Sequence, residues 1–396
     1  MEHARVVVVG GGQAGLAVSR ELAGHGVDHV VLERGRVGQT WRDRWDSFCL
    51  VTPNWTVQLP GGAYDGPDPD GFMPRDEIVG YLEGYAAGSP VREGVDVESV
   101  ERDGGDFVLR TSEGDVAADI LVVATGTYRL PHLPPAAETL PASLMRLTVD
   151  DYRSPEALPD GAVLVVGSGQ SGCQLAEELL GAGREVVLAC GRAPWLPRRV
   201  GGRDFVWWLV ESGFLDAGMD SLPGPEARLF ANVLATGGGG GHDLHLRVLR
   251  DAGVSLAGRF LGADDGAARF APDLAESVAW GDERYRQLAE LFRKHGLAEG
   301  LPEPEPFDAA TLDSVDLARF GAVIFTTGFR PDYASWLPWR EAFDPQGFPL
   351  HDDGASTAVP GLFFLGTHFL RKRKSSLLIG VGEDAAIVAE RVAAAG

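Results

Sequence analysis

The sequence predicts an α/β fold in which two dinucleotide-binding, Rossmann-like units follow one another along 396 residues. Two glycine patterns carry this prediction: residues 5–15 read RVVVVGGGQAG and residues 162–172 read AVLVVGSGQSG. Each pattern follows an apolar run that is typical of a buried strand and precedes a segment compatible with a helix. A tight turn between strand and helix directs free backbone N–H groups and the positive end of the helix dipole at a pyrophosphate. Because the pattern occurs twice, we expect two nucleotide cofactors.

The glycines of both patterns stand in G-x-G-x-x-G register. The first turn places Gly10, Gly12 and Gly15 in this register with Gln13 and Ala14 between them, and the second places Gly167, Gly169 and Gly172 with Ser168, Gln170 and Ser171. We expect all of these residues except Gly172 to contact a cofactor.

The end of the second strand in each unit indicates which nucleotide binds there. Residues 29–33 end on Glu33, 23 positions after Gly10, where a carboxylate accepts hydrogen bonds from the free ribose hydroxyls of FAD or NAD. We therefore assign Glu33 and the neighbouring Arg34 to the first cofactor. The same offset in the second unit falls on Cys190, and the arginines that follow suit the 2′-phosphate of NADPH. Arg192 is the first candidate for that phosphate and Arg198 the second, although a solvated loop would show the same arginines.

Composition excludes several classes of function. The chain has 44% hydrophobic and 23% charged residues and a formal charge of −22, so we expect a globular protein that repels nucleic acid and anionic lipid. No apolar stretch reaches the roughly 18 residues of a membrane span, and the first strand begins near the N-terminus, so we expect a cytoplasmic protein without stable membrane insertion. Three cysteines without a C-x-x-C pair disfavour a dithiol centre, and we predict no metal site.

Proline-rich segments and two Thr-Gly pairs predict how the chain divides. A buried strand at 120–124 stops at Thr125-Gly126, and a second at 322–326 stops at Thr327-Gly328. We expect both pairs to mark crossings between domains. The predicted first domain is therefore discontinuous, residues 1–155 and 321–396, and the predicted second domain, 156–320, is inserted in it. Residues 200–320 would add a helical and loop insertion on the substrate side.

The motifs occur in an order that identifies a family. Residues 10–15 (GGGQAG), 38–41 (GQTW), 123–128 (VATGTY), 167–172 (GSGQSG) and 327–330 (TGFR) follow one another as in flavin-containing monooxygenases. The whole chain resembles this family, and above all a bacterial branch of flavoproteins described as involved in potassium or cation transport. Plant-type indole-pyruvate monooxygenases are more distantly similar. The resemblance implies FAD on the first glycine turn, NADPH on the second, and an active site between the domains.

The resemblance also implies roles for individual residues. The flavin would be lined by Gln39, Thr40 and Trp41 on one side and by Ala124, Thr125 and Gly126 on the other, with Val97 and Gly366 as further contacts. Independently of the resemblance, Gly382 opens a predicted C-terminal helix whose positive end either faces the flavin or is an ordinary helix start. Asn54 would hydrogen-bond near N5 or O4 of the flavin. His368 follows Gly366 closely, which makes it a catalytic candidate. The basic run at 371–374 is either a solvated loop or an anion-attracting rim of the active site.

The expected activity is that of an NADPH- and FAD-dependent monooxygenase, which forms a C4a-(hydro)peroxyflavin and oxygenates a small organic substrate at nitrogen or sulfur. Its partners would be that substrate and O2, and a homodimer is left open. One departure keeps two alternatives open: Thr148 stands where the family fingerprint has a histidine, and we count Thr148 among the catalytic candidates. A threonine cannot carry a proton as imidazole does. An NADPH-dependent flavoprotein reductase or oxidase, or a redox-sensing accessory of cation transport, therefore remains an alternative.

Overall fold

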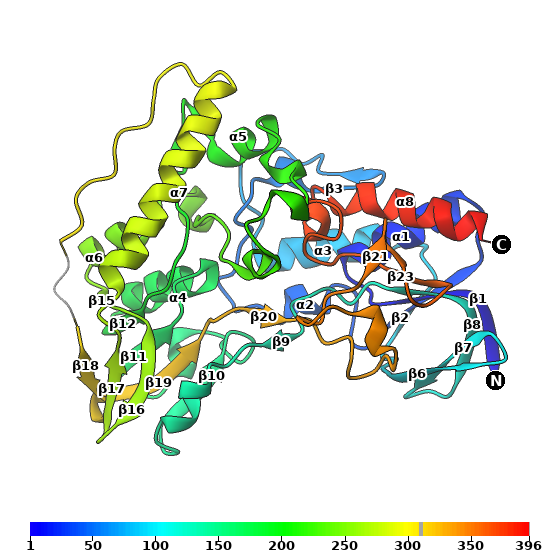
Figure 1. Cartoon of the computed structure of the whole chain (residues 1–396), viewed down its shortest axis with the longest axis horizontal. Coiled ribbons are helices and arrows are strands. Elements are labelled where there is room, and N and C mark those ends of the chain that lie inside the picture. The colour runs from blue at the N-terminus through cyan, green and yellow to red at the C-terminus, as the bar shows by residue number, and fades with distance from the viewer. Residues whose placement is uncertain (309–311, 396) are drawn as a thin grey trace.

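A computed structural model describes residues 1–308 and 312–395, and it contains two main sheets that lie at opposite ends of the long axis (Figure 1). The first sheet has the order β21-β22-β23-β8-β1-β2-β5. Its centre is formed by β1 (Glu2–Val9), which pairs in parallel with β2 (His29–Glu33) and β8 (Val116–Val123). These strands are apolar along most of their length because a parallel sheet is covered on both faces. The α/β fold predicted from the sequence is thereby confirmed.

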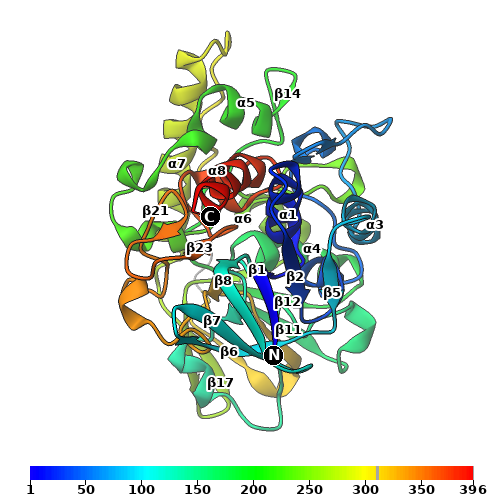
Figure 2. The ribbon, with the colours of Figure 1, turned by 90° about the vertical axis from the view of Figure 1, so that its right-hand side faces the viewer.

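The last part of the chain returns to complete the first sheet. Strand β23 (Leu362–Phe364) pairs in parallel with β8, and β5 (Val91–Glu93) pairs with β2 at the other edge. Helices α1 (Gln13–Gly24) and α8 (Val381–Ala394) lie side by side, although their sequences are at opposite ends of the chain (Figure 2). Strands β6 (Val97–Asp103) and β7 (Asp106–Thr111) form an antiparallel pair, and β7 also pairs with β8.

The second sheet has five parallel strands. Their order is β10 (Met145–Thr148), β19 (Phe320–Phe325), β11 (Ala162–Val166), β12 (Val186–Ala189) and β15 (Ser255–Ala257). Helices α4 (Gln170–Gly181) and α6 (Leu246–Ala252) belong to this unit, as does the antiparallel sheet of β16 (Phe260–Asp264), β17 (Ala267–Phe270) and β18 (Ser314–Asp316). The sheet thus extends to Met145 and Phe325, on either side of the predicted interval 156–320.

The chain passes twice between the sheets, and the two passages pair with each other. Strand β9 (Leu130–Pro131) follows β8, strand β20 (Phe329–Arg330) follows β19, and the two form an antiparallel pair. Gly126 and Gly328 have φ angles of 73° and 84°, which glycine adopts without the strain that a side chain would cause. Both Thr-Gly pairs predicted as crossings therefore lie at the passages.

The segment between β12 and β15 forms a separate layer with α7 (Leu274–Lys294), the long helix at the upper left of Figure 1. Helix α5 (Phe205–Glu211) begins after Asp204, whose carboxylate accepts the Val206 N–H at 2.9 Å. Trp208 of α5 stacks on Phe292 of α7, with ring centroids 5.8 Å apart. This layer builds the wall that faces the first domain.

Shorter elements complete the fold. They are α2 (Gln39–Arg42), α3 (Arg75–Tyr85), β3 (Gln58–Leu59), β4 (Gly62–Ala63), β13 (Arg199–Val200), β14 (Arg203–Asp204), β21 (His351–Asp352), β22 (Ala355–Ser356) and the 3-10 turns η1 (Asn54–Thr56), η2 (Pro135–Thr139), η3 (Pro155–Ala157), η4 (Phe214–Asp216), η5 (Met219–Ser221), η6 (Pro225–Leu229), η7 (Gly238–Gly240), η8 (Leu317–Arg319), η9 (Arg340–Ala342) and η10 (Arg373–Ser376). Among the helices of the described residues, none has the combination of length and apolar character needed to cross a bilayer.

Candidate functional site

The two glycine turns are built alike. Gly10 has a φ of 112° and Gly167 one of 109°, a conformation that L side chains rarely adopt. A Cβ on Gly15 would overlap the carbonyl oxygen of Gly10, and a Cβ on Gly172 would overlap that of Gly167. Helices α1 and α4 can approach their strands this closely only because both positions are glycine. The glycine pattern therefore has the same physical basis in both units.

Both turns leave room for an anion. No side chain caps the N-terminus of α1 or α4 in the described structure, so their first N–H groups remain available to a ligand. A Cβ built on Gly12 would meet nothing within 4 Å, and one built on Gly169 would meet only the Cβ of Ala231, at 3.7 Å. Each turn thus offers free donors beside open space, which fits the pyrophosphate of a dinucleotide.

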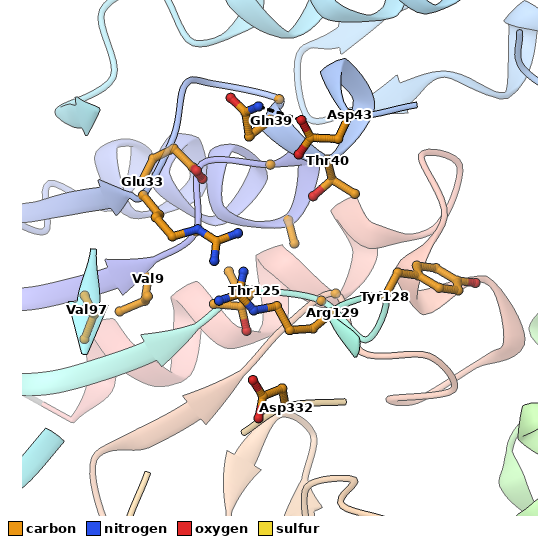
Figure 3. Close-up of a pocket in the computed structure, with 18 of the residues that line it drawn as sticks. Val9, Glu33, Gln39, Thr40, Asp43, Val97, Thr125, Tyr128, Arg129 and Asp332 are labelled. Atoms are coloured by element: carbon orange, nitrogen blue, oxygen red, sulfur yellow. Dashed lines mark hydrogen bonds between the residues drawn. The ribbon is translucent and has the colours of Figure 1, made fainter. Parts of the chain in front are cut away.

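A cavity of about 620 Å³ starts at the first turn and runs along the carboxyl ends of the central strands (Figure 3). Its volume suits a cofactor. Fourteen of the predicted residues line it: Gly10, Gly12, Gln13, Ala14, Glu33, Arg34, Gln39, Thr40, Trp41, Val97, Ala124, Thr125, Gly126 and Gly366. Sequence reasoning did not assign Asp43, Tyr128, Arg129 and Asp332 to the site, although they also line this cavity. Tyr128 ends the motif at 123–128, and the other three belong to no motif.

Glu33 stands at the end of β2 with its carboxylate held in place. Its Oε2 atom accepts the Gly11 N–H at 2.6 Å and its Oε1 atom accepts the Gly35 N–H at 2.8 Å. The side chain lines the first cavity and carries the label Glu33 at the left of Figure 3. A fixed carboxylate here accepts hydrogen bonds from ribose hydroxyls and repels a 2′-phosphate. The site therefore suits FAD, whose ribose hydroxyls are free, better than a dinucleotide with a 2′-phosphate such as NADPH.

A second cavity of about 760 Å³ meets the first at Gln13. The indole N–H of Trp41 donates to Gln13 Oε1 at 2.9 Å, and Gln13 Nε2 donates to the carbonyl oxygen of Ser376 at 3.2 Å. All three residues line both cavities, together with Thr40 and Tyr128. From this junction the second cavity extends between α5, η6, α7 and η10, where most of its lining is apolar. Its position between the two units is that of the predicted active site.

His368 lines the second cavity, close to the junction. Its Nδ1 atom lies 3.3 Å from the Ser376 hydroxyl, and its ring lies 6.4 Å from that of Tyr128. Burial, followed by the positive charges of Arg373 and Arg228, lowers the pKa of His368 to about 4. The imidazole is therefore neutral at physiological pH and can exchange hydrogen bonds without carrying a charge.

Two residues expected to be catalytic have structural roles instead. The Asn54 amide nitrogen donates to the carbonyl oxygen of Asp68 at 2.9 Å, and its oxygen accepts the Met73 N–H at 2.7 Å, so this buried side chain ties a loop together. The Thr148 hydroxyl donates to Asp151 Oδ2 at 2.7 Å in a turn after β10. Neither residue lines the two cavities described here. Both assignments are corrected for this reason.

Gly382 also differs from expectation. It lies in the first turn of α8, where a Cβ would come within 3.0 Å of Pro60, and it lines neither of the two cavities. The glycine allows α8 to pack closely on the loop before β4. A role in helix packing therefore replaces the expected flavin contact.

The second turn is surrounded by residues that hold neighbouring loops. The Ser168 hydroxyl exchanges hydrogen bonds with the backbone of Gly191, accepting its N–H at 3.0 Å and lying 3.1 Å from its carbonyl oxygen. The Gln170 amide bonds to both backbone groups of Ala235, accepting the N–H at 3.0 Å. Arg192 follows β12 and is exposed, and within the described residues it has no ion pair. Its position after Gly191 keeps it as the candidate for a 2′-phosphate.

Arg198 does not have the position expected of a phosphate ligand. Its side chain is 2% exposed, its Nη2 atom lies 2.6 Å from Asp204 Oδ2, and its Nη1 atom donates to the carbonyl oxygen of Val51 at 2.8 Å. The guanidinium also lies 4.3 Å from the ring centroid of Phe72. These contacts join the two units and occupy the side chain, which corrects the cofactor assignment.

Comparison with known proteins agrees with this architecture. Residues 7–202 match the family model described as pyridine nucleotide-disulphide oxidoreductase. An oxidoreductase of Geobacillus kaustophilus described as CzcO-like is 32% identical over 97% of both chains. Indole-3-pyruvate monooxygenase YUCCA1 of Oryza sativa subsp. japonica is 36% identical over 44% of each chain. The solved flavin-containing monooxygenase of Stenotrophomonas maltophilia has a TM-score of 0.70 at 22% identity, covering 100% of this chain and 99% of its own.

Proposed function

The chain belongs to the CzcO-like bacterial branch of the flavin monooxygenase family, and on this premise we propose that it transfers one oxygen atom of O2 to nitrogen or sulfur of a small organic substrate. It is an FAD-dependent oxidoreductase, and its cofactors are FAD and NADPH. The observation that carries the proposal is the junction at Gln13, where the cavity of the first glycine turn opens into a largely apolar cavity between the two units.

The residues of the first cavity would hold FAD. The N–H groups after Gly12 would bind its pyrophosphate, Glu33 its ribose hydroxyls, and the residues at 39–41 and 124–126 would surround the ring. When bound, FAD supplies hydride acceptance from NADPH and the activation of O2. In this proposal residues 1–155 and 321–396 form the FAD domain, except β10 (Met145–Thr148) and β19 (Phe320–Phe325), which belong to the second sheet. NADPH binds the second unit at the turn before α4 and at Arg192.

The second cavity would protect the reaction from water. Aromatic and aliphatic side chains of α5, α7 and the segment 368–379 line it, and a cavity of this kind excludes bulk solvent from reactive oxygen species. His368 offers a neutral hydrogen-bonding group in this lining. The chain's contribution to the chemistry is then orientation at the Gln13 junction and exclusion of water.

One observation favours a second candidate function. No ionisable side chain occupies position 148, and the Thr148 hydroxyl is engaged by Asp151. An NADPH oxidase that passes both electrons to O2 and releases hydrogen peroxide would need no further group. Product analysis therefore has to distinguish oxygen transfer from peroxide release.

The test measures NADPH consumption and both possible oxygen products in the same reaction. The purified protein with FAD is given NADPH, O2 and methyl phenyl sulfide, while NADPH loss, peroxide and sulfoxide are measured. Oxygenation consumes one NADPH, one proton and one O2 for each sulfoxide and yields NADP⁺ and water. We expect sulfoxide to account for most of the NADPH consumed. Peroxide equal to the NADPH consumed, with methyl phenyl sulfide and with a panel of amines, would establish the oxidase instead. Failure to oxidise NADPH at all would refute both and leave the sensor alternative.

A further inference from the structure

The second cavity is positively charged, although the chain as a whole carries −22 charges. Its lining contains four arginines and one lysine: Arg44, Arg228, Arg284, Arg373 and Lys294. Among its described lining residues Glu290 is the one acid, and it pairs with Arg293 and Lys294 on the exposed side of α7. A concave, largely apolar site lined by one sign of charge concentrates ligands of the opposite sign.

Some of these cationic side chains are paired with a carboxylate of the protein, and others are not. Arg228 is paired with Asp344 and also donates to Gln346 Oε1 at 2.9 Å, and Arg44 lies 3.7 Å from Asp150. Within residues 1–308 and 312–395, Arg284 and Arg373 have neither a hydrogen bond nor an ion pair from their side chains, and the Nε atom of each is buried without a partner. Both side chains line the cavity, so their Nη groups, which have no protein partner among the described residues, are available to a ligand there.

Arg373 is the more informative of the two. Its three basic neighbours are paired: Arg371 lies 2.8 Å from Asp353, and Lys372 and Lys374 lie 2.8 Å and 3.0 Å from Asp216. Arg373 instead lies over two aromatic rings, 4.2 Å from the centroid of Phe214 and 4.8 Å from that of Phe369. Burial lowers the pKa of Arg373 to about 10, and no acid opposes this effect, yet the group stays protonated at neutral pH.

Arg373 lies in a different part of the second cavity from the second glycine turn, which is the expected NADPH site. It begins η10, whose last residue, Ser376, lines both cavities and accepts the Gln13 hydrogen bond at their junction. Its positive charge also acts on His368. The second glycine turn lies near Gln170 and Ala231, in the part of the cavity formed by the inserted unit. Arg373 is therefore on the flavin side, where a substrate and not the NADPH phosphates would meet it.

We propose that the second cavity binds an organic anion with an apolar body, and that Arg373 holds the anionic group, a carboxylate or an equivalent oxyanion. Phe214, Phe369, Leu209 and Leu215 would cover the apolar body. A guanidinium suits this role because its donors match a carboxylate in pairs and its plane stacks on aromatic rings. That this anion is a substrate rests on the proposed function. The new claim is the chemical class of the substrate.

Binding measurements without turnover test the inference. The two probes are (phenylsulfanyl)acetate, a carboxylate, and its neutral amide 2-(phenylsulfanyl)acetamide. They share one apolar thioether body and differ in charge. Calorimetric titration into the FAD-loaded protein, without NADPH, gives both dissociation constants. We expect the carboxylate to bind about 10- to 100-fold more tightly, since a hydrogen bond to a charged group has about this effect. Arg373→Gln should remove this preference, and Arg373→Lys should keep part of it.

A matched control and a cofactor measurement complete the design. Arg286→Gln changes an exposed arginine of α7 that pairs with Glu303 and does not line the cavity, so the carboxylate preference should persist. FAD content and thermal unfolding confirm that each variant is folded. Equal affinity of the wild-type protein for both probes would overturn the inference, as would an Arg373→Gln variant that loses NADPH affinity while the carboxylate preference is unchanged. A carboxylate preference combined with release of all oxygen as peroxide would refute the proposed oxygenation but leave the anion site standing.

Discussion

Replacement of Gly12 with alanine should weaken FAD binding without harming the apoprotein. Gly12 has φ −86° and ψ −172°, an extended conformation open to any residue, and a Cβ there meets nothing within 4 Å. The substitution also reduces the entropy of the unfolded chain, which stabilises a compatible site by about 0.4–1 kcal/mol. We therefore expect the unfolding midpoint of the apoprotein to stay constant or to rise slightly.

The same methyl group occupies the space beside the free N–H groups of α1. A pyrophosphate displaced by it loses at least one hydrogen bond between a charged and a neutral group, worth about 1.5–3 kcal/mol, or about 10- to 100-fold in the dissociation constant of FAD. Titration of the apoprotein with FAD, followed by tryptophan fluorescence, measures this constant.

Two further glycine variants serve as controls. Gly169→Ala is the equivalent change in the second turn, so it should leave FAD affinity unchanged and raise the KM for NADPH. Gly15→Ala should destabilise the apoprotein itself, because its Cβ overlaps the carbonyl oxygen of Gly10. The reasoning fails if Gly12→Ala binds FAD as tightly as the wild type, since the cofactor would then not pass this turn.

Three other variants probe charge. Arg192→Ala should raise the KM for NADPH about 10-fold or more and leave that for NADH unchanged; equal losses in steady-state kinetics would contradict its phosphate role. His368 has a native pKa of about 4 against 6.5 when unfolded, so the unfolded state binds an extra proton between these values and stability falls as the pH falls through that window. Urea unfolding at pH values across it should show a weaker dependence for His368→Gln, and an unchanged slope would count against this assignment. Asp204→Asn leaves the Arg198 guanidinium buried without its partner, which should cost about 3–5 kcal/mol in the free energy of unfolding. A urea midpoint equal to that of the wild type would show that Arg198 is solvated.

The elements that sequence patterns predicted are those specified by local contacts. A strand, a glycine turn and a helix follow one another within about 20 residues, so the pattern around Gly10 contains nearly all of the information that shapes the turn. The Thr-Gly crossings were predictable for a similar reason, because each pair directly follows an apolar strand in the sequence and glycine permits the positive φ found at Gly126 and Gly328.

The features that the sequence did not reveal depend on contacts between distant segments. Arg198 resembles a solvated arginine in its own segment, but Val51 and Phe72 of the other unit bury it. Arg373 belongs to a basic run in which every residue has the same charge, and only the pairing of its neighbours with Asp216 and Asp353 distinguishes it. Sequence periodicity contains no information on such partners, which lie about 20 to 160 positions away.

Because the two glycine turns are alike, residues outside the turns must determine which of them binds FAD and which binds NADPH. Because both turns bring helix and strand together in the same way, neither can distinguish FAD from NADPH by its backbone. The difference lies at the end of the next strand, where the first unit presents the Glu33 carboxylate and the second has Cys190. Burial raises the pKa of Cys190 to about 12, so this thiol stays neutral and does not repel a 2′-phosphate approaching Arg192. We therefore expect the charge at this position, together with Arg192, to decide which nucleotide each turn accepts.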